Sequence, residues 1–178
     1  MHESKHNVSD GIDTQAIQAA KKHLIDGAVT RGYQGDLTKM IAMLNMALAT
    51  ELVCVLRYKR HYYTATGFQN RPIKAEFLQH AQDEQEHADL IAERIIQLNG
   101  LPDFNPASLL ERSHAEYDDS KTLQEMIKAN LIAERVAIES YRQMIEVIGH
   151  DDPTTRQMLI SIMAKEEEHA DDMRDLLV

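Results

Sequence analysis

The sequence predicts an all-α protein built as a four-helix bundle. Residues that favour helices (Ala, Leu, Glu, Gln, Lys and Met) are frequent in the chain. With 7 Gly, 4 Pro and no Trp in 178 residues, it has few of the turn residues that a fold of short strands needs. Four long segments carry apolar residues at alternating steps of three and four, the pattern of helices that turn one face toward a shared core.

The first 35 residues are predicted to form an N-terminal extension with one short accessory helix. Apolar residues from about Thr14 to Thr30 follow helical spacing, and Gly32 and Gly35 end the pattern. The extension has four basic and four acidic residues, so it is neutral rather than a basic arm. We expect residues 1–35 to lie outside the bundle, which occupies residues 36–178.

The first two bundle helices are joined by a short link. One begins after Asp36, a residue type that caps helices, and stops before Gly67. The next begins at Pro72 and ends at Asn99 and Gly100. Because the link is short, these two helices are expected to run antiparallel.

Residues 101–120 contain two prolines and no sustained period, so they are predicted to form a long connection. About twenty extended residues reach about 66 Å, which exceeds the ~37 Å length of a 25-residue helix. The connection can therefore cross the length of the bundle. The third helix then ends at Gly149, and the fourth follows Asp152 and Pro153.

Six polar residues occupy core positions at which the stripes otherwise carry Leu, Ile, Met and Ala. Buried carboxylates repel one another and cost several kcal/mol each unless cations compensate them. In Glu-x-x-His, both side chains leave the same helix face, and two such motifs with two single glutamates can hold two metal ions. The predicted ligands are Glu51, Glu84, His87, Glu134, Glu166 and His169. Oxygen and nitrogen ligands without thiolate suit iron or manganese, with zinc as a substitute.

The weight of this prediction lies in the whole set. A single Glu-x-x-His arises by chance on a solvated, glutamate-rich helix face. Here each motif follows a single core glutamate at a similar distance, from position 51 to 84 and from 134 to 166. The two halves therefore suggest a pseudo-twofold pair of helix hairpins. A metal-free helical interaction module is the alternative that lacks a site.

Charge and cysteine content limit the classes of partner and compartment. A formal charge of −10 disfavours binding to nucleic acids and anionic membranes. The single Cys54 cannot form an internal disulfide, which favours a reducing compartment. The N-terminus shows no apolar signal segment. We expect that no stretch reaches the ~20 apolar residues of a membrane span. We expect a cytoplasmic protein without a membrane partner.

Three runs of sequence carry a family resemblance: Glu84 to Asp89, Ile95 to Pro102, and Lys165 to His169. Through them, residues from about Met40 to Leu177 resemble bacterioferritin-type members of the ferritin-like superfamily. The resemblance implies a ferroxidase centre with two Fe ions per subunit. In it, the bridging ligands would be Glu84 and Glu166, the single carboxylates Glu51 and Glu134, and the nitrogen ligands His87 and His169.

The resemblance also matches Tyr58 to a tyrosine that the family places beside the site. A core tyrosine with a satisfied hydroxyl group is the alternative. Haem-binding members carry methionine where this chain has Gln85, so no haem is expected. Only nine residues follow His169, too few for the fifth helix of 24-subunit shells. A Dps-like homo-oligomer of twelve subunits is therefore the expected assembly, and its neutral N-terminal tail argues against DNA binding.

The expected function is oxidation of Fe(II) by O2 or H2O2, for iron storage and detoxification. One alternative is a rubrerythrin-like peroxidase or another diiron oxidase without storage, although the chain lacks the Cys-x-x-Cys motif that usually accompanies rubrerythrins. Another alternative is a Dps-like shell that sequesters metal or protects DNA.

Overall fold

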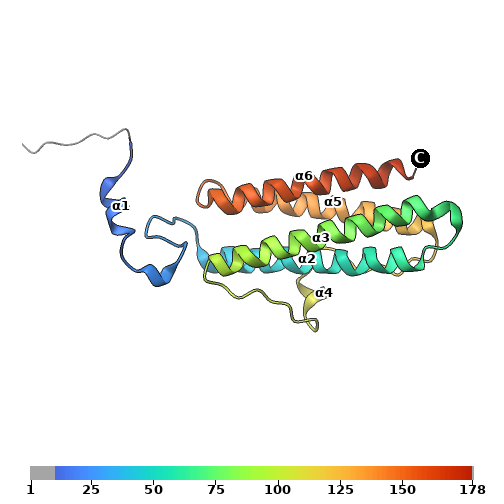
Figure 1. Ribbon diagram of the computed structural model, residues 1–178, viewed down its shortest axis with the longest axis horizontal. Helices are drawn as coiled ribbons and strands as arrows, with labels where there is room; N and C mark the ends of the chain where they lie inside the picture. Colours follow the sequence, from blue (N-terminus) through green and yellow to red (C-terminus); the bar gives the residue numbers. More distant parts are fainter. Residues whose placement is uncertain (1–10, 178) are drawn as a thin grey trace, which may run out of the picture.

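The computed structural model describes residues 11–177 and contains helices but no strand among them. Two hairpins form the bundle, as Figure 1 shows. The long helices are α2 (Leu37–Thr64), α3 (Arg71–Gln97), α5 (Leu123–Ile148) and α6 (Pro153–Asp175). The all-α four-helix bundle and the long crossover between its hairpins are therefore confirmed. Residues 1–10 of the predicted extension and Val178 lie outside the described residues.

The ends of the long helices follow the local signals in the sequence. The Asp36 side chain accepts a hydrogen bond from the backbone N of Lys39 at 3.1 Å, which caps α2. A capping box between Thr122 and Glu125 opens α5. At the other end of α5, Gly149 takes a positive φ of 55°, a conformation that glycine adopts without steric cost.

The accessory helix is much shorter than predicted. Only α1 (Thr14–Ala19) forms, followed by a 3₁₀ turn at Leu24–Asp26, instead of one helix to residue 30. Ile17 is 52% exposed and Leu24 is 81% exposed, so no element of residues 11–177 covers the apolar stripe. Short helices need such packing, because their nucleation is unfavourable. The segment therefore projects from one end of the bundle (Figure 1).

A buried ion pair fixes the end of the bundle from which the extension projects. Arg94 of α3 lies 2.9 Å from the carboxylate of Asp152, which caps α6. The hydroxyl group of Tyr33 donates to the same carboxylate at 3.0 Å. This network joins α3, α6 and the segment that precedes α2.

The crossover between α3 and α5 runs along α2 and contains the short α4 (Leu109–Arg112). The Arg112 guanidinium donates to the backbone oxygens of Asn45 at 3.1 Å and Asp103 at 3.0 Å. The bond to Asn45 holds the crossover against α2. The bond to Asp103 also satisfies a backbone oxygen that a connection without secondary structure would leave unpaired.

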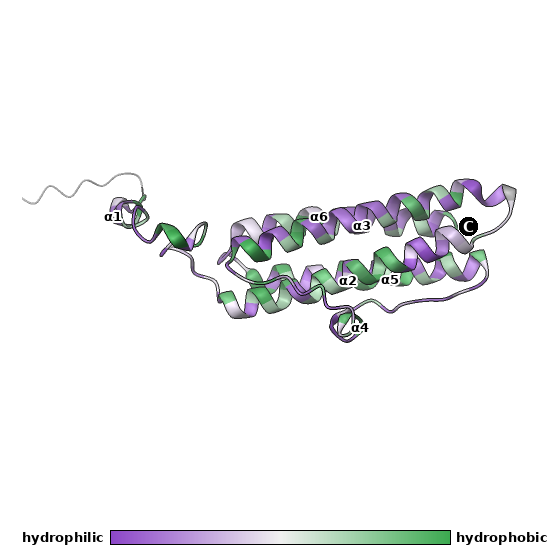
Figure 2. Cartoon of the chain, turned by 60° about the horizontal axis from the view of Figure 1, so that its bottom comes forward, coloured by the Kyte–Doolittle hydropathy of each residue, from purple (hydrophilic) through white to green (hydrophobic). Residues whose placement is uncertain are grey.

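The helix α2 is apolar over most of its length (Figure 2). It is long and apolar enough to cross a membrane, with a mean hydropathy of 1.7 over its most apolar window. The expectation that no stretch reaches this composition was therefore wrong. Because 61% of the window is buried against the rest of the chain, α2 is the core helix of the bundle.

Candidate metal centre

The structure brings the six predicted ligands together in the middle of the bundle. Each long helix contributes, with the single glutamates on α2 and α5 and the Glu-x-x-His motifs on α3 and α6. All six are buried, and none is more than 7% exposed. They are Glu51, Glu84, His87, Glu134, Glu166 and His169. The core stripes of four helices thus meet at a cluster of polar groups.

His87 is the centre of the first group of ligand atoms. Its Nδ1 lies 2.9 Å from Oε1 of Glu166, 3.4 Å from Oε2 of Glu51 and 3.6 Å from Oε2 of Glu84. These four residues offer atoms that lie within 4.8 Å of one another, close enough to hold one metal ion.

His169 is the centre of the second group. Its Nδ1 lies 3.4 Å from Oε2 of Glu166, 3.5 Å from Oε1 of Glu84 and 4.0 Å from Oε2 of Glu134. These four residues form a second set that could hold an ion. Glu84 and Glu166 belong to both sets, so each can place one oxygen on either side of the cluster.

Unpartnered atoms line the space between these side chains. Seven buried ligand atoms form no hydrogen bond, namely Oε2 of Glu51, Oε1 of Glu84, Nδ1 of His87, Oε2 of Glu134, both carboxylate oxygens of Glu166, and Nδ1 of His169. Even the 2.9 Å contact of His87 with Glu166 is not aligned as a hydrogen bond. Buried polar atoms are normally paired. A set of oxygen and nitrogen atoms that all lack hydrogen-bond partners fits a pair of metal ions.

Without metal, the single carboxylates retain protons at neutral pH. Burial, together with the charge of Glu84, raises the pKa of Glu51 to about 8. Burial also raises the pKa of Glu134 well above its usual value, and the charges of Glu84 and Glu166 add to this effect. Glu51 is therefore mostly protonated at pH 7 in the metal-free centre, and Glu134 holds its proton to a higher pH than an exposed carboxyl group does.

The imidazoles hold protons for the opposite reason. Burial alone would lower the pKa of His169, but contacts with Glu166 and Glu84 outweigh it and raise the pKa to about 11. The same balance raises the pKa of His87 far above its usual range, through Glu166, Glu51 and Glu84. Protons thus provide the positive charge that metal ions would provide in a loaded centre.

Two tyrosines orient the single glutamates in a symmetric way. The hydroxyl group of Tyr58 on α2 donates to Glu134 on α5, and that of Tyr141 on α5 donates to Glu51 on α2. The predicted position of Tyr58 beside the cluster therefore has a structural counterpart. Tyr141 was not among the predicted site residues. Its position after Glu134 could have indicated it, because Tyr58 and Tyr141 each lie seven residues after the single glutamate of the same helix.

Two further residues contact the cluster from outside and were not among the predicted site residues. Nε2 of His169 lies 3.0 Å from Oδ2 of Asp83, which fixes the orientation of the imidazole ring. The ring of His80 stacks on that of His169, with centroids 3.9 Å apart. Spacing alone could have placed His80, four residues before Glu84, on the same helix face.

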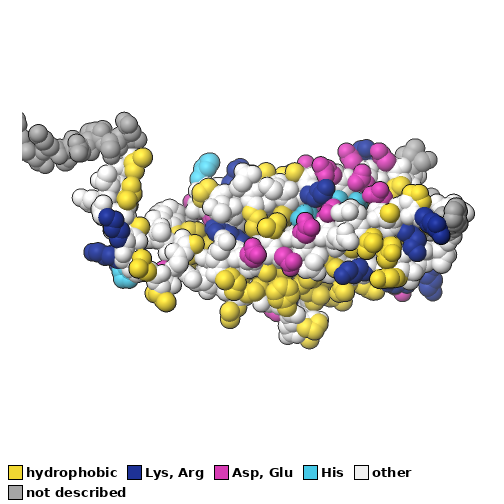
Figure 3. All heavy atoms as spheres, viewed as in Figure 1, with side chains coloured by type: hydrophobic (Ala, Val, Ile, Leu, Met, Phe, Trp, Pro, Cys, Tyr) yellow, Lys and Arg dark blue, Asp and Glu magenta, His cyan; other side chains and the backbone are white. Residues whose placement is uncertain are grey.

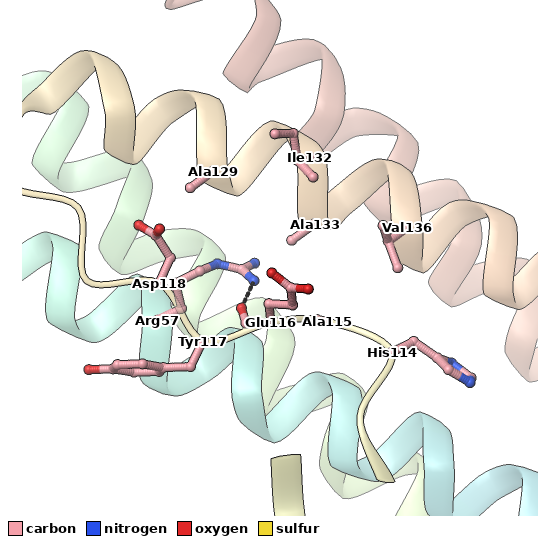
Figure 4. A pocket seen from close by; sticks show the side chains of 10 residues that line it. All are labelled: Arg57, His114, Ala115, Glu116, Tyr117, Asp118, Ala129, Ile132, Ala133 and Val136. Carbon is pink, nitrogen blue, oxygen red and sulfur yellow. Dashed lines mark hydrogen bonds between the residues drawn. The ribbon is translucent and has the colours of Figure 1, made fainter. Parts of the chain in front are cut away.

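A surface pocket of about 280 Å³ lies between α2, α5 and the crossover (Figure 4). Arg57 lines it although the residue is only 1% exposed. Its guanidinium donates to Oδ1 of Asn130 at 2.9 Å, to the backbone oxygen of Glu116 at 3.1 Å, and to Sγ of Cys54 at 3.4 Å. Burial raises the pKa of the Cys54 thiol, which stays neutral in the core. The six predicted ligands do not line this pocket, so it is separate from the metal centre.

The fold and the cluster define a helical-bundle protein with paired carboxylate and histidine groups in its core. A model of the Ferritin-like domain family matches residues 41–178. The chain belongs to this family.

Individual relatives agree with this assignment. The chain is 29% identical over 145 residues to a nutrient stress-induced DNA-binding protein of Synechococcus sp., covering 78% of this chain and 81% of the relative. It is 29% identical over 139 residues to a bacterioferritin of Mycobacterium bovis, covering 78% and 82%. A solved structure of the bacterioferritin-related protein from Bacteroides fragilis, described as a dodecameric thioferritin, is 32% identical. That match has a TM-score of 0.77 and covers 81% of this chain and 87% of the other.

Proposed function

We propose that this protein is a ferroxidase that oxidises Fe(II) with O2 or H2O2 for iron storage and detoxification. The observation that carries the proposal is the set of seven unpartnered ligand atoms, shared between two overlapping groups. The proposed ligands are Glu51, Glu84, His87, Glu134, Glu166 and His169, with two Fe ions per chain. The bacterioferritin relatives support iron as the metal, and manganese or zinc are candidate substitutes for the same oxygen and nitrogen ligands. We expect no haem, because Gln85 stands where haem-binding members of the family carry methionine.

The ligand set suits this reaction because anionic oxygen ligands stabilise Fe(III) relative to Fe(II). Two Fe(II) ions supply one electron each. One H2O2 with two protons then gives two waters, or one O2 with two protons gives one H2O2. The chain's part is to hold both ions at once through Glu84 and Glu166, and to keep Glu51 and Glu134 in place through the two tyrosines.

A matched pair of variants tests the proposal. Anaerobic protein is loaded with Fe(II), then O2 or H2O2 is added separately while the absorbance of Fe(III) and the particle mass are followed. The wild type and Glu86→Gln, which changes an exposed acid two residues from Glu84, should oxidise iron equally. Glu84→Gln should lose most of the activity, because the change removes the charge of a ligand common to both ions.

Two results of this experiment would contradict parts of the proposal. Equal oxidation rates for Glu84→Gln and Glu86→Gln would refute the assignment of the centre. Oxidation that stops at two irons per chain would refute storage while leaving the centre intact. In that case the protein would be a diiron oxidase or peroxidase instead.

The proposal includes a homo-oligomeric shell of twelve subunits. The related Bacteroides fragilis protein is described as dodecameric. This chain leaves large apolar side chains exposed on α2, α4 and α5, including Leu56 at 51%, Leu110 at 62% and Ile132 at 54%. Native mass spectrometry should give twelve chains per particle. The net charge of −10 leads us to expect that nucleic acid is not a partner. One relative is named for DNA binding, which makes this expectation worth testing. Retardation of DNA by the particle at physiological salt would contradict it.

A further inference from the structure

Arg57 of α2 carries a buried positive charge. The residue is only 1% exposed, and its guanidinium does not lose its proton in a protein. Its hydrogen-bond acceptors are all uncharged groups, namely Oδ1 of Asn130, the backbone oxygen of Glu116 and Sγ of the Cys54 thiol. Among residues 11–177, no carboxylate forms an ion pair with it. Burying a charge without a partner is costly, so the charge must interact with groups further away.

The metal centre is the neighbouring source of negative charge. The Arg57 guanidinium lies over the ring of Tyr58, 5.6 Å from the ring centroid, and the hydroxyl group of that ring donates to Glu134. Burial alone would lower the pKa of Arg57, but the charges that Cys54 and Glu134 can carry outweigh burial and raise it above its usual range. The guanidinium therefore interacts with the centre through the protein interior rather than through water.

The two sides of the centre carry charges of opposite sign. Arg57 bonds to α5 and to the crossover, so its charge lies on the side of α2 and α5. The helices α3 and α6 form the other side of the bundle, and exposed acidic side chains gather over them (Figure 3). A net positive charge in the centre is thus repelled from one side and attracted toward the other.

The effect of Arg57 depends on the valence of the bound ions. Two divalent ions balance the four ligand carboxylates, so the loaded centre is neutral and the guanidinium has little net interaction with it. Oxidation of both Fe(II) ions leaves two more positive charges among the same four carboxylates. Charges in a buried site are weakly screened, so Arg57 disfavours Fe(III) in the centre more than it disfavours Fe(II).

We propose that the fixed charge of Arg57 disfavours trivalent ions in the centre and so promotes the departure of Fe(III) after each oxidation. This role in iron turnover rests on the proposed ferroxidase function, because a storage protein must clear its centre before the next two Fe(II) ions bind. The discrimination between divalent and trivalent ions does not rest on that function, since it depends on charge alone.

Redox-inert ions test the discrimination without the iron reaction. Zn(II), and Ga(III) supplied as its nitrilotriacetate complex, are titrated into the full chain and its variants. Arg57→Gln removes the charge and should bind Ga(III) about tenfold more tightly, with Zn(II) affinity within about threefold of the wild type. Arg57→Met, a second neutral variant, should give the same shifts. Arg57→Lys keeps the charge and should behave as the wild type does with both ions.

Iron provides a second readout. The centre is loaded with two Fe(II) ions per chain, and a mediated redox titration follows the absorbance of Fe(III). Arg57→Gln should lower the reduction potential by about 59 mV, which corresponds to a tenfold change for a one-electron step. After one round of oxidation, the time needed before fresh Fe(II) is oxidised at the initial rate should lengthen about tenfold in the same variant.

Arg60→Gln is the matched control. Arg60 lies three residues further along α2 and also donates to the crossover, at 3.2 Å to the backbone oxygen of Ser120 and at 3.1 Å to that of Asp119. It is only partly buried, so water and salt screen its charge. This variant loses the same charge and the same kind of anchor, and it should leave the Ga(III) affinity, the potential and the recovery time unchanged.

Two results would overturn the proposal. One is an equal change of Ga(III) and Zn(II) affinity in Arg57→Gln and Arg57→Met, including no change in either. The other is a loss of both affinities in Arg57→Lys as well, which would assign the residue to holding the crossover instead. Discrimination between Ga(III) and Zn(II) in a protein that does not oxidise Fe(II) would refute the proposed function and leave the charge effect standing.

Discussion

Metal loading of the centre should release at least three protons at pH 7, because each bound proton now occupies a ligand that a metal ion needs. His87 and His169 carry one each, since their carboxylate neighbours raise both pKa values, that of His169 to about 11. Glu51, with a pKa of about 8, carries a third, and the raised pKa of Glu134 favours a fourth. With all four protons bound, the metal-free centre is neutral, because two carboxylates are balanced by two imidazolium groups. Four carboxylates balanced by two divalent ions are equally neutral.

The sign of the pH dependence follows from these shifts. All four groups have raised pKa values, so their protons compete with metal at neutral pH. The affinity for two ions should therefore increase with pH, by about tenfold per unit for each proton released. Above pH 8, where Glu51 loses its proton, the number released should fall by one.

Isothermal titration calorimetry measures the release directly. Zn(II) is titrated anaerobically into the protein in buffers of different ionisation enthalpy, and the slope of observed heat against that enthalpy gives the proton count. His150→Gln, which changes an exposed histidine, serves as the control and should release the same number. A release of one proton or none at pH 7 would refute the argument that protons take the place of metal in the cluster.

Four other substitutions test the surroundings of the centre and the helix ends of the bundle that holds it. Tyr58→Phe and Tyr141→Phe should each weaken two-ion binding by about tenfold, because each removes the hydrogen bond that orients a single glutamate; calorimetric titration measures the loss. Arg94→Met leaves the Asp152 carboxylate, only 2% exposed, without its cation and should cost about 3 kcal/mol in the free energy of unfolding. Thr122→Ala removes the α5 capping box and should cost about 1 kcal/mol, measured by urea denaturation.

Exposed residues on the long helices provide controls for these four variants. Tyr63→Phe, on α2 and 75% exposed, should bind metal as the wild type does. Thr154→Ala, on an exposed position of α6, should leave the unfolding free energy nearly unchanged. Equal metal affinity in both tyrosine variants and the wild type would contradict the orienting role. A loss below about 1 kcal/mol in Arg94→Met would show that its carboxylate partner finds compensation elsewhere.

The bundle could be predicted from the sequence because every long helix carries both its period and its end signals. Asp36 begins one helix and Gly149 ends another where the sequence placed them. The length of the accessory helix could not be predicted in this way. Apolar residues at helical spacing stabilise a helix only if another part of the protein packs against them. Ile17 and Leu24 have the required spacing, but no partner surface.

The candidate ligands could be predicted because a charged residue at a core position of a helix is costly to bury unless a bound metal compensates its charge. The residues that contact those ligands show no such conflict between residue type and position. Tyr141 reads as an ordinary core residue, and Asp83 as one acid among many on α3. Only the pairing across helices, with Glu51 in one case and His169 in the other, gives these residues a role.

The apolar character of α2 has a consequence for synthesis of the chain. As it leaves the ribosome, α2 is as apolar as a membrane segment and has no neighbours. Its first partner, α3, is the next helix to emerge, and the roughly 30 residues needed to complete it take only a few seconds at about 5–20 residues per second. Glu51 and Arg57 within α2 oppose insertion into a bilayer during that interval. The short link between α2 and α3 therefore limits how long the nascent chain presents this surface to membranes and to other unfinished chains.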